Sequence, residues 1–428
     1  MKETACDVAI IGGGAAGLAA AAAAREGGAE KVLLLERDHL LGGILPQCIH
    51  TGFGLLVFKE DLTGPEYIHR WVEKSRGMKV EAKLETMVLE VGPDRVITAT
   101  STAGGMMRVK AGAVVLAMGC RERTRGALAI PGTRPAGIFT AGQAQRFVNI
   151  EGYMPGERVV ILGSGDVGMI MARRLTFEGA KVEAVVEVLP WVGGLMRNKV
   201  QCLDDFGIPL LLSHTVTQIC GNQRVTAVKV AEVDADRQPD LKTERTIGCD
   251  TLLLSVGLIP ENELTEKCGI EMDAVTGGAL LDDRLETSVP GIFACGNVAH
   301  VCDIVDNVTQ MGLAAGREAA RFAGGKAAPE RDYIRLKAGE NVRYVIPQRV
   351  SRRSLLEGNV QVQLRVARPG VNVRLSIKAG GEPVYRLPKK AVHPGEALVG
   401  ELSPKFAGLF GKADELVVDV EPLKKQGA

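Results

Sequence analysis

The sequence predicts a mixed α/β fold, because a strand, a glycine-rich turn, a helix and a second strand follow one another twice. The first copy has the apolar strand 8–11, the turn 12–17, an Ala-rich helix and the strand 31–35, and the second occupies 158–186. After residue 331, apolar and polar residues alternate with a period of two. This pattern predicts a small β-rich domain at the C-terminal end.

The first turn has the pattern GxGxxG, in which each glycine has a physical task. Gly12 allows the tight turn, Gly14 lets a pyrophosphate approach backbone N–H groups at the positive helix end, and Gly17 lets helix and strand pack closely. The alternative is a purely structural turn, but the strand, the helix and the acid around it favour a dinucleotide site. The predicted first site also includes Ala15, Ala16, Glu36 and Arg37.

Glu36 ends the second strand, where its carboxylate can accept hydrogen bonds from the hydroxyls of an adenosine ribose. A carboxylate there favours a nucleotide without a 2′-phosphate. The loop 40–54 follows directly and is rich in glycine. Gly42 and Gly43 are therefore expected to form the thin backbone that passes close to the cofactor.

Cys48 and His50 are the candidate catalytic residues of this loop. A cysteine followed two residues later by a histidine can be a thiolate with a proton partner. The structural interpretation, which we favour, is a small buried thiol and a hydrogen-bonded imidazole that line the cofactor loop.

The chain then returns to the first domain. A helix is predicted at 67–76. Three segments alternate like antiparallel strands: 80–91, 95–100 and 106–110. The apolar run 113–119 is typical of a strand buried on both faces of a parallel sheet. Ala117 and Gly119, at the end of this strand, belong to the predicted first site.

The second copy follows a segment, 138–146, that is expected to be a loop and a short helix between domains. Its turn repeats GxGxxG, and its second strand ends in Glu187. Because every element is present, a second dinucleotide is expected. Glu187 would repel a 2′-phosphate, and residues 188–191 contain no Arg to hold one, which favours NAD(H) over NADP(H). The predicted second site comprises Gly163, Gly165, Asp166, Val167, Gly168, Glu187 and Gly257.

The segment 280–320 returns to the first site. A turn and strand end at Gly296 and Asn297, where a polar side chain can face a cofactor. A helix is predicted to begin beside Gln310 and Met311, and its dipole can stabilise negative charge on a reduced cofactor ring.

Composition limits the class of protein. The chain has 428 residues, 46% of them hydrophobic, which suits two to four α/β domains. Lys plus Arg number 52 and Asp plus Glu 51, so charge gives no argument for nucleic acid. We expect no transmembrane segment and no cleavable signal, hence a cytoplasmic protein. The nine cysteines include no CxxC pair, so neither a metal site nor an iron–sulfur cluster is expected.

Together these motifs resemble the two-dinucleotide-binding flavoproteins of the pyridine nucleotide-disulfide oxidoreductase type, over about residues 5–325. The resemblance implies FAD at the first site and NAD(H) at the second, in two Rossmann-like domains. The segment 130–145 resembles the branch with the alpha subunits of sarcosine oxidase, opine oxidase and hydrogen cyanide synthase. The segment 42–50 resembles flavoproteins that accompany glycerol-3-phosphate dehydrogenase-like proteins.

The chain departs from the family pattern at two kinds of position. Disulfide reductases carry two cysteines about five residues apart, whereas Cys48 has no such partner, so a dithiol relay is not expected. Family members usually bind the flavin ribityl chain with an Asp, and here that position holds Asn297, which can still make one bond. Met118 replaces a Thr of the first return strand.

The resemblance also implies a domain plan. The expected domains are a discontinuous FAD domain at 1–122 and 272–330, an inserted NAD domain at 123–271, and a β-rich interaction domain at 331–428. Strands at 360–366 and 371–377 are predicted to form a hairpin around Arg368-Pro-Gly370. Between residues 331 and 390, 14 side chains are Lys or Arg and 4 are Asp or Glu, which indicates either docking onto an acidic partner or solubilising charge.

Two functions compete. The first is an electron-transfer subunit in which nicotinamide and FAD exchange a hydride while a partner subunit handles the organic substrate, of glycerol-3-phosphate or amine and amino-acid type. The second is a stand-alone NADH-dependent reductase of a thiol, peroxide or quinone that uses Cys48. A non-catalytic scaffold is disfavoured because both cofactor sites are complete. An oligomer is compatible with each of these functions.

Overall fold

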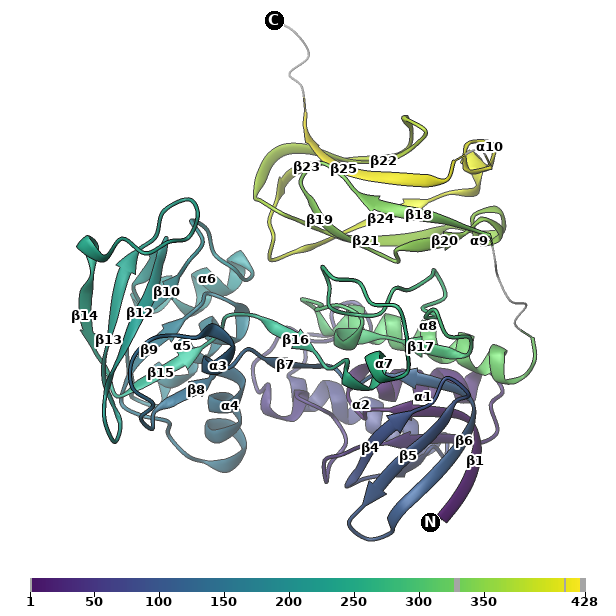
Figure 1. Cartoon of the computed structure of the whole chain (residues 1–428), viewed down its shortest axis with the longest axis horizontal. Coiled ribbons are helices and arrows are strands. Elements are labelled where there is room, and N and C mark those ends of the chain that lie inside the picture. The colour runs from purple at the N-terminus through teal and green to yellow at the C-terminus, as the bar shows by residue number, and fades with distance from the viewer. Residues whose placement is uncertain (1, 327–331, 412, 424–428) are drawn as a thin grey trace, which may run out of the picture. The chain divides into compact units, whose positions relative to one another are not determined.

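The computed structural model describes residues 2–326, 332–411 and 413–423. It forms two compact units, one of Met1–Cys120 with Pro260–Ala428 and one of Arg121–Ile259 (Figure 1). The expected domain limits, including those at 123 and 271, stay predictions.

The first unit is built on a seven-stranded sheet with the order β3-β2-β1-β6-β5-β4, in which β17 also pairs with β6. Its strands are β1 (Lys2–Ile11), β2 (Val32–Leu35), β3 (Glu81–Lys83), β4 (Thr86–Val91), β5 (Val96–Ser101), β6 (Gly105–Leu116) and β17 (Ile292–Ala294). In register, Ile11 lies beside Leu35 and Leu116, and Leu116 beside Ala294, all in parallel pairs. The residues that follow these four therefore meet at one edge of the sheet.

Strand β6 is longer than the sequence indicated. The segments 106–110 and 113–119 were expected to be separate strands, but residues 105–116 form one strand of 12 residues, and 117–119 follow it. Its first half pairs with β5 in the antiparallel sense, and its second half pairs with β17 in the parallel sense. Strand β6 thus joins the antiparallel strands β4 and β5 to the parallel part of the sheet.

Before residue 327, the α-helices of the first unit are α1 (Ala15–Glu26), α2 (Gly64–Gly77), α7 (Glu263–Lys267) and α8 (Val305–Ala323). Helices α1 and α8 pack backbone to backbone, because a Cβ on Gly312 would lie 2.3 Å from the carbonyl oxygen of Ala16, and one on Gly316 would lie 2.2 Å from that of Ala20. Ten residues of α1 are buried. This Ala-rich helix is therefore a central part of the core.

The predicted start of the last helix at residue 310 is wrong, since α8 begins at Val305. Its first turns carry polar residues that face inward, which hides the apolar period. Buried Asp306 accepts hydrogen bonds from the backbone N–H groups of Leu56 and Val57, each at 3.3 Å. The Thr309 hydroxyl lies 2.6 Å from the Tyr67 hydroxyl.

The second unit repeats the plan with a parallel five-stranded sheet of order β11-β10-β9-β15-β8 and a separate antiparallel sheet β12-β13-β14. Its strands are β8 (Ile138–Thr140), β9 (Arg158–Leu162), β10 (Lys181–Glu187), β11 (Leu210–Leu212), β12 (His214–Gly221), β13 (Val225–Glu232), β14 (Arg245–Gly248) and β15 (Thr251–Leu254). Its helices are α3 (Arg125–Leu128), α4 (Ala141–Arg146), α5 (Asp166–Phe177) and α6 (Met196–Cys202). Residues 138–140, expected as loop, are an edge strand, because they pair with β15. The two chain segments that join the units, β7 (Cys120–Glu122) and β16 (Leu258–Pro260), pair with each other.

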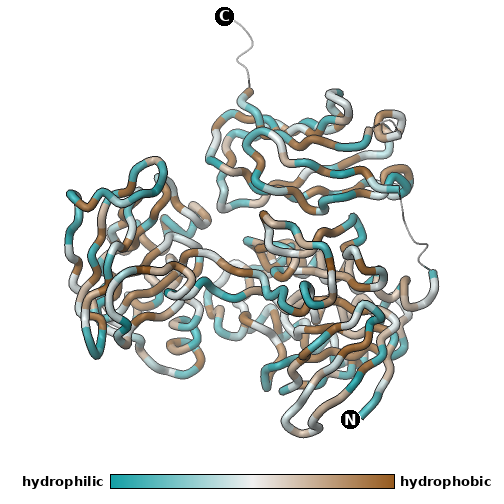
Figure 2. Tube along the Cα trace, in the orientation of Figure 1, coloured by the Kyte–Doolittle hydropathy of each residue, from teal (hydrophilic) through white to brown (hydrophobic). Residues whose placement is uncertain are grey.

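The C-terminal part of the first unit is a two-sheet sandwich with its own apolar core, and its sheets have the orders β20-β18-β25-β22-β23 and β19-β21-β24. Its elements are β18 (Tyr333–Ala338), β19 (Val342–Ile346), β20 (Arg349–Ser351), α9 (Arg352–Glu357), β21 (Val360–Val366), β22 (Gly370–Ala379), β23 (Glu382–Val392), β24 (Ala397–Leu402), α10 (Ala407–Phe410) and β25 (Glu415–Pro422). Figure 2 shows apolar and polar residues alternating along its strands. The β-rich prediction is confirmed.

The predicted hairpin at 360–377 is wrong. Strand β21 pairs with β19 and β24, whereas β22 pairs with β23 and β25 in the other sheet. The turn at Arg368-Pro-Gly370 thus carries the chain from one sheet to the other. Period-two alternation shows that a strand has one buried face, but it does not say which strand lies beside it.

Candidate cofactor sites

The first glycine turn is shaped by close backbone contacts. Gly12 has φ +104°, and a Cβ there would lie 2.4 Å from the Ala117 carbonyl oxygen. A Cβ on Gly17 would lie 1.8 Å from the Gly12 carbonyl oxygen. Gly14 is the N-cap of α1, which has neither a side-chain cap nor an acidic residue in its first turn. The amides of that turn, from Ala15 and Ala16 onward, therefore suit an anionic group such as a pyrophosphate.

Glu36 is held against the same turn. One carboxylate oxygen accepts a hydrogen bond from the Gly13 N–H at 2.6 Å, and the other accepts from the Asp38 N–H at 2.8 Å. The residue is 8% exposed. Because each carboxylate oxygen has a second lone pair, the group can also accept ribose hydroxyls.

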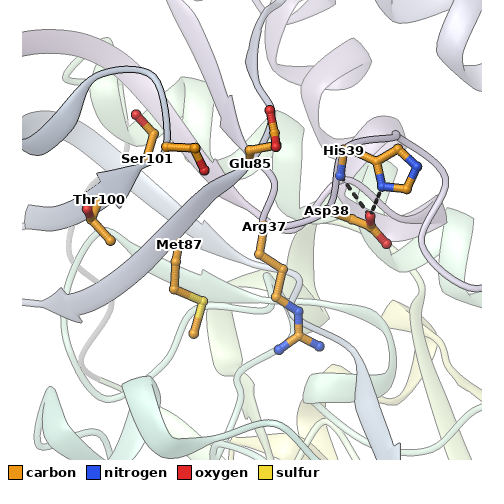
Figure 3. A pocket seen from close by; sticks show the side chains of 8 residues that line it. Arg37, Asp38, His39, Glu85, Met87, Thr100 and Ser101 are labelled. Carbon is orange, nitrogen blue, oxygen red and sulfur yellow. Dashed lines mark hydrogen bonds and ion pairs between the residues drawn. The ribbon is translucent and has the colours of Figure 1, made fainter.

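Arg37 continues from Glu36 into a cavity of about 550 Å³. Its lining comprises Arg37, Asp38, His39, Glu85, Met87, Thr100, Ser101 and Thr102. Figure 3 shows the Asp38 carboxylate bonded to His39, whose backbone N–H donates at 2.7 Å. Glu36 directly follows β2, which ends at Leu35, and the next three residues, 37–39, line this cavity.

The loop that carries Gly42 and Gly43 lies beside the first turn. The Gly42 N–H donates to the Gly13 carbonyl at 2.9 Å. Gly43 has φ +59°, and a Cβ there would lie 3.1 Å from the Gly14 Cα. The structure thus brings both predicted loop glycines to the predicted pyrophosphate position.

Cys48 lies in this loop, directly after a 3-10 turn at Leu45–Gln47. Burial raises the pKa of the Cys48 thiol to about 12, and its Sγ lies 3.5 Å from the Ile44 carbonyl oxygen. The His50 ring has Nδ1 2.9 Å from the Thr51 carbonyl oxygen and packs against Phe53. Partial burial therefore disfavours the charged thiolate form of Cys48.

The ends of β6 and β17 bring the remaining first-site residues to the same edge. Ala117 follows Leu116, which pairs with Ala294, and Gly296 follows two residues after Ala294. A Cβ on Gly296 would lie 2.9 Å from the Ala16 side chain. The next residue, Asn297, accepts a hydrogen bond from the Cys302 N–H at 3.0 Å and places its amide nitrogen 3.4 Å from the Cys120 Sγ. Gly119, with φ +72°, immediately precedes Cys120.

Gln310 and Met311 do not lie at a helix start. Both follow the first turn of α8, where Gln310 is exposed and Met311 is buried with its sulfur 3.9 Å from the Cys302 Sγ. The N-terminal turn instead begins at Val305, and α8 has no side-chain cap. Sequence reasoning missed Val305 because the apolar residues that signal the helix come only after it.

The second glycine turn has the same contacts as the first. Gly163 has φ +97°, and a Cβ there would lie 2.2 Å from the Ser255 carbonyl oxygen. A Cβ on Gly168 would lie 2.6 Å from the Ser255 Cβ. Gly165 is the N-cap of α5 and has no side-chain cap. Val167 lies in the first turn of α5, and Gly257, with φ +104°, lies shortly after β15.

Glu187 repeats the arrangement of Glu36. One carboxylate oxygen accepts from the Ser164 N–H at 2.8 Å and the Ser164 hydroxyl at 2.6 Å, and the other accepts from the Leu189 N–H at 2.9 Å. Ser164 also accepts a hydrogen bond from the Gly193 N–H at 2.7 Å. Ser164 was not predicted as a site residue, although its place within GxGxxG was a usable signal.

Asp166, predicted as a cofactor residue, is engaged within the second unit. Its Oδ1 accepts from the Leu195 N–H at 2.8 Å and from the Asn198 side-chain amide at 2.7 Å. The carboxylate therefore ties the loop before α6 to the N-terminus of α5. These hydrogen bonds indicate that Asp166 shapes the site.

The comparison with protein families decides the class. The family model for pyridine nucleotide-disulphide oxidoreductases matches residues 6–319. The chain belongs to this family. Membership implies FAD and NAD(P)H as cofactors, which confirms the cofactor prediction at that level. The preference for NADH over NADPH stays a prediction.

Individual relatives agree with the family. An opine oxidase subunit from Agrobacterium tumefaciens (strain Ach5) is 26% identical over 57% of this chain and 48% of its own length. Hydrogen cyanide synthase subunit HcnB of Pseudomonas protegens is 26% identical over 63% of this chain and 61% of its own length. The chain thus spans less than two thirds of each. Both relatives lie in the branch that the segment 130–145 predicted.

A solved structure supports the fold. Thioredoxin reductase from T. acidophilum aligns with a TM-score of 0.62 and 23% identity, over 76% of this chain and 99% of that one. The predicted α/β fold with two Rossmann-like domains is therefore confirmed. In the part of the chain that the structure describes, no helix has the length and apolar character needed to cross a membrane.

Proposed function

We propose that this chain is a cytoplasmic FAD-dependent NADH oxidoreductase that acts as the electron-transfer subunit of a larger dehydrogenase. The observation that carries the proposal is the repeated site geometry. In both units an uncapped helix follows a glycine turn, and a buried carboxylate is bonded to the second residue of that turn. Two sites of this kind suit two dinucleotides.

The residues of the chain bind and orient, and the two cofactors, when bound, supply the hydride exchange. The first-turn amides of α1 would hold the pyrophosphate of FAD, and Glu36 would hold its adenosine ribose. Asn297 would hold the ribityl chain, as the family resemblance implies, and the positive N-terminal turn of α8 would stabilise negative charge on the reduced ring. This division of roles requires no protein nucleophile, in agreement with the disfavoured thiolate of Cys48.

The second site favours NADH. Glu187 is 6% exposed, its Oε1 accepts a hydrogen bond from the Leu189 N–H and keeps a lone pair for a ribose hydroxyl, and a 2′-phosphate at that position would meet its negative charge. The residues that follow, Val188, Leu189, Pro190 and Trp191, carry no cationic side chain. Neither contact nor charge in this stretch would hold a 2′-phosphate.

In this proposal the partner handles the organic substrate. That substrate is of glycerol-3-phosphate type or of amine and amino-acid type. Two relatives are named as subunits of an opine oxidase and of a hydrogen cyanide synthase, which supports a role within a larger assembly. The alternative is a stand-alone reductase of a thiol, peroxide or quinone. It requires a reactive Cys48, and burial of that thiol favours the first function.

The test is cofactor content followed by reduction. Purified protein should release FAD, not FMN, on denaturation, and its flavin absorbance should be bleached by NADH at least tenfold faster than by NADPH. Equal rates with the two nucleotides would contradict the role of Glu187, and a colourless protein that takes up no FAD would contradict the whole proposal.

A glycine variant separates binding from folding. A Cβ on Gly14 would meet only the Gly43 Cα, at 3.8 Å, and Gly14 has φ −79°, so a Cβ there strains no protein group. Gly14→Val should therefore fold with the thermal stability of the apoprotein while failing to retain FAD, because the side chain fills the pyrophosphate position. Retention of FAD by the folded variant would place the flavin elsewhere.

A further inference from the structure

The C-terminal sandwich holds the loop that precedes α8 through a buried ion pair. The guanidinium of Arg365, on β21, donates to the Asp303 carboxylate and to the Val301 carbonyl oxygen, the latter at 3.2 Å. The two charged side chains are 13% and 10% exposed. The second oxygen of Asp303 accepts from the Ala397 N–H at 2.8 Å. Both oxygens of this carboxylate are thus bonded to the sandwich.

The remaining donors of Arg365 are used inside the sandwich. Its Nε donates to the Tyr344 hydroxyl at 3.0 Å, and one Nη donates to the Pro394 carbonyl oxygen at 2.7 Å. The guanidinium is therefore fixed at both ends. The planar guanidinium donates in fixed directions, so it sets the orientation of its partners as well as their distance. A lysine ammonium in the same place would not do so.

The other side of the same loop meets the proposed flavin site. The backbone N–H of Cys302, between Val301 and Asp303, donates to the Asn297 side-chain oxygen at 3.0 Å. The Cys302 sulfur lies 3.7 Å from His300 Nε2 and 3.9 Å from the Met311 sulfur. The loop ends two residues after Asp303, where α8 begins at Val305.

The His300 side chain of this loop is buried, at 2% exposed. Burial lowers the pKa of His300 to about 4, so its imidazole carries no charge at neutral pH. The ring packs 5.9 Å from the Tyr344 ring. His300 therefore contributes contact rather than charge, and Arg365 is the cation that faces Asp303.

We propose that Arg365 is a positioning residue for the flavin site: by fixing Asp303 and Val301, it sets the direction of the Asn297 amide and the place of the first turn of α8. This inference rests on the proposed role of Asn297 in holding FAD. A residue of the C-terminal sandwich thereby acts on a cofactor that it does not touch. The sandwich is a part of the flavin site and not solely a docking surface.

The test compares two arginines of the same sandwich. Arg352 also pairs with carboxylates, those of Asp332 and Asp414, and donates to two backbone carbonyls, of Phe410 and Ala413, but none of these belongs to the flavin loop. Arg365→Met and Arg352→Met should both lower the melting temperature. Arg365→Met should raise the FAD dissociation constant about tenfold, the value of one lost hydrogen-bonded contact, whereas Arg352→Met should leave it within about twofold.

A second set of variants asks whether the effect passes through Asn297. In an Asn297→Ala background, Arg365→Met should change the FAD dissociation constant by less than about twofold, because the two substitutions remove one chain of contacts. Arg365→Lys, which keeps the charge and loses the fork, should lie between wild type and Arg365→Met. The flavin midpoint potential should shift in Arg365→Met and Arg365→Lys but not in Arg352→Met.

The outcomes are distinguishable. Unchanged FAD affinity in both Arg365→Met and Arg365→Lys would overturn the inference while leaving the proposed function intact. The same holds if the double variant Arg365→Met, Asn297→Ala raises the FAD dissociation constant by the full product of the two single effects. If Arg365→Met does not fold, the comparison of Arg365→Lys with Arg352→Met decides by the same criteria. A wild-type protein that binds no FAD would instead contradict the proposed function itself.

Discussion

Cys48 shows how burial limits the chemistry of a single side chain. Its place two residues before His50 suggested a thiolate with a proton partner, and the sequence could not decide against this because spacing says nothing about solvation. Burial raises the pKa of the thiol to about 12. The favoured structural interpretation of Cys48 agrees with this shift, although its role stays untested.

Replacing Cys48 tests that interpretation. Cys48→Ser should leave the rate of flavin bleaching by NADH within about twofold of wild type, because hydride exchange depends on the proximity of two rings and not on a thiol. Stopped-flow absorbance measures this rate. A loss of disulfide or peroxide turnover beyond about tenfold, with bleaching intact, would favour the stand-alone reductase.

Asp282 provides a pH-dependent term in stability. It is 1% exposed and accepts a hydrogen bond at 2.9 Å from the hydroxyl of Tyr333, in the C-terminal sandwich. Burial, and then the charge of Asp283, raise the pKa of Asp282 to about 6. A carboxyl whose pKa is raised on folding stabilises the protein when it is protonated, below about pH 4, and this contribution is lost as the pH rises through about 6.

The corresponding prediction concerns thermal unfolding as a function of pH. Relative to wild type, Asp282→Asn should gain roughly 2–3 kcal/mol of stability between pH 4 and pH 8, because about two pKa units of differential ionisation are removed. The neighbouring Glu286 carboxyl, whose pKa burial also raises, is present in both proteins, so the difference isolates Asp282. A difference that stays constant with pH would mean that Asp282 remains ionised throughout.

At the scale of elements, close helix packing depends on two glycines of α8. Gly312→Ala would place a Cβ 2.3 Å from the Ala16 carbonyl oxygen, so α8 must move away from α1. We expect a loss of about 1–3 kcal/mol and weaker FAD retention. Gly77→Ala, at the end of α2, is the control, because a Cβ added there would have no neighbouring atom within 4 Å. This substitution should leave the free energy of unfolding unchanged or raise it by about 0.5 kcal/mol. Denaturant unfolding compares the two, and equal effects would show that the contact is not tight.

The sequence predicted most elements that have a local signature. Both glycine turns and the strand that ends in Glu36 follow from residues close to each other in the chain. The true start of α8 depends on Asp306, whose partners Leu56 and Val57 lie about 250 residues away, so no local pattern marks it. The predicted pairing of 360–366 with 371–377 fails for the same reason, because β21 pairs with β19 and β24, and β22 pairs with β23 and β25.

At the scale of the whole molecule, the basic composition of the C-terminal part has two explanations. Some cations are bound internally: Arg349 donates to the Thr287 carbonyl oxygen, Arg352 bonds to Asp332, and Lys378 pairs with Asp419. Others, including Arg335 and Lys337 on β18, are exposed, and Lys337 also lies 3.8 Å from the Glu415 carboxylate. Docking onto an acidic partner can therefore use only the second group, and the domain's interaction role stays a prediction.

Charge reversal separates the two groups. The double variant Arg335→Glu, Lys337→Glu should keep its FAD but slow electron exchange with the partner about tenfold at low salt, and the difference should fade towards 1 M salt, where charges are screened within about 3 Å. Arg76→Glu, an exposed reversal on α2 outside the sandwich, is the control. Exchange that is unchanged at every salt concentration would show that this face is solvated surface only.

The contact between α1 and α8 has a geometric consequence. Gly312 lies over Ala16 and Gly316 over Ala20, so the two helices run in the same direction. Since α8 starts seven residues before Gly312 and α1 one residue before Ala16, the positive end of α8 extends roughly 9 Å further, at a rise of about 1.5 Å per residue. The N-termini of the two helices are therefore offset along their common direction, so two anionic groups of one ligand would have to lie a matching distance apart to reach both.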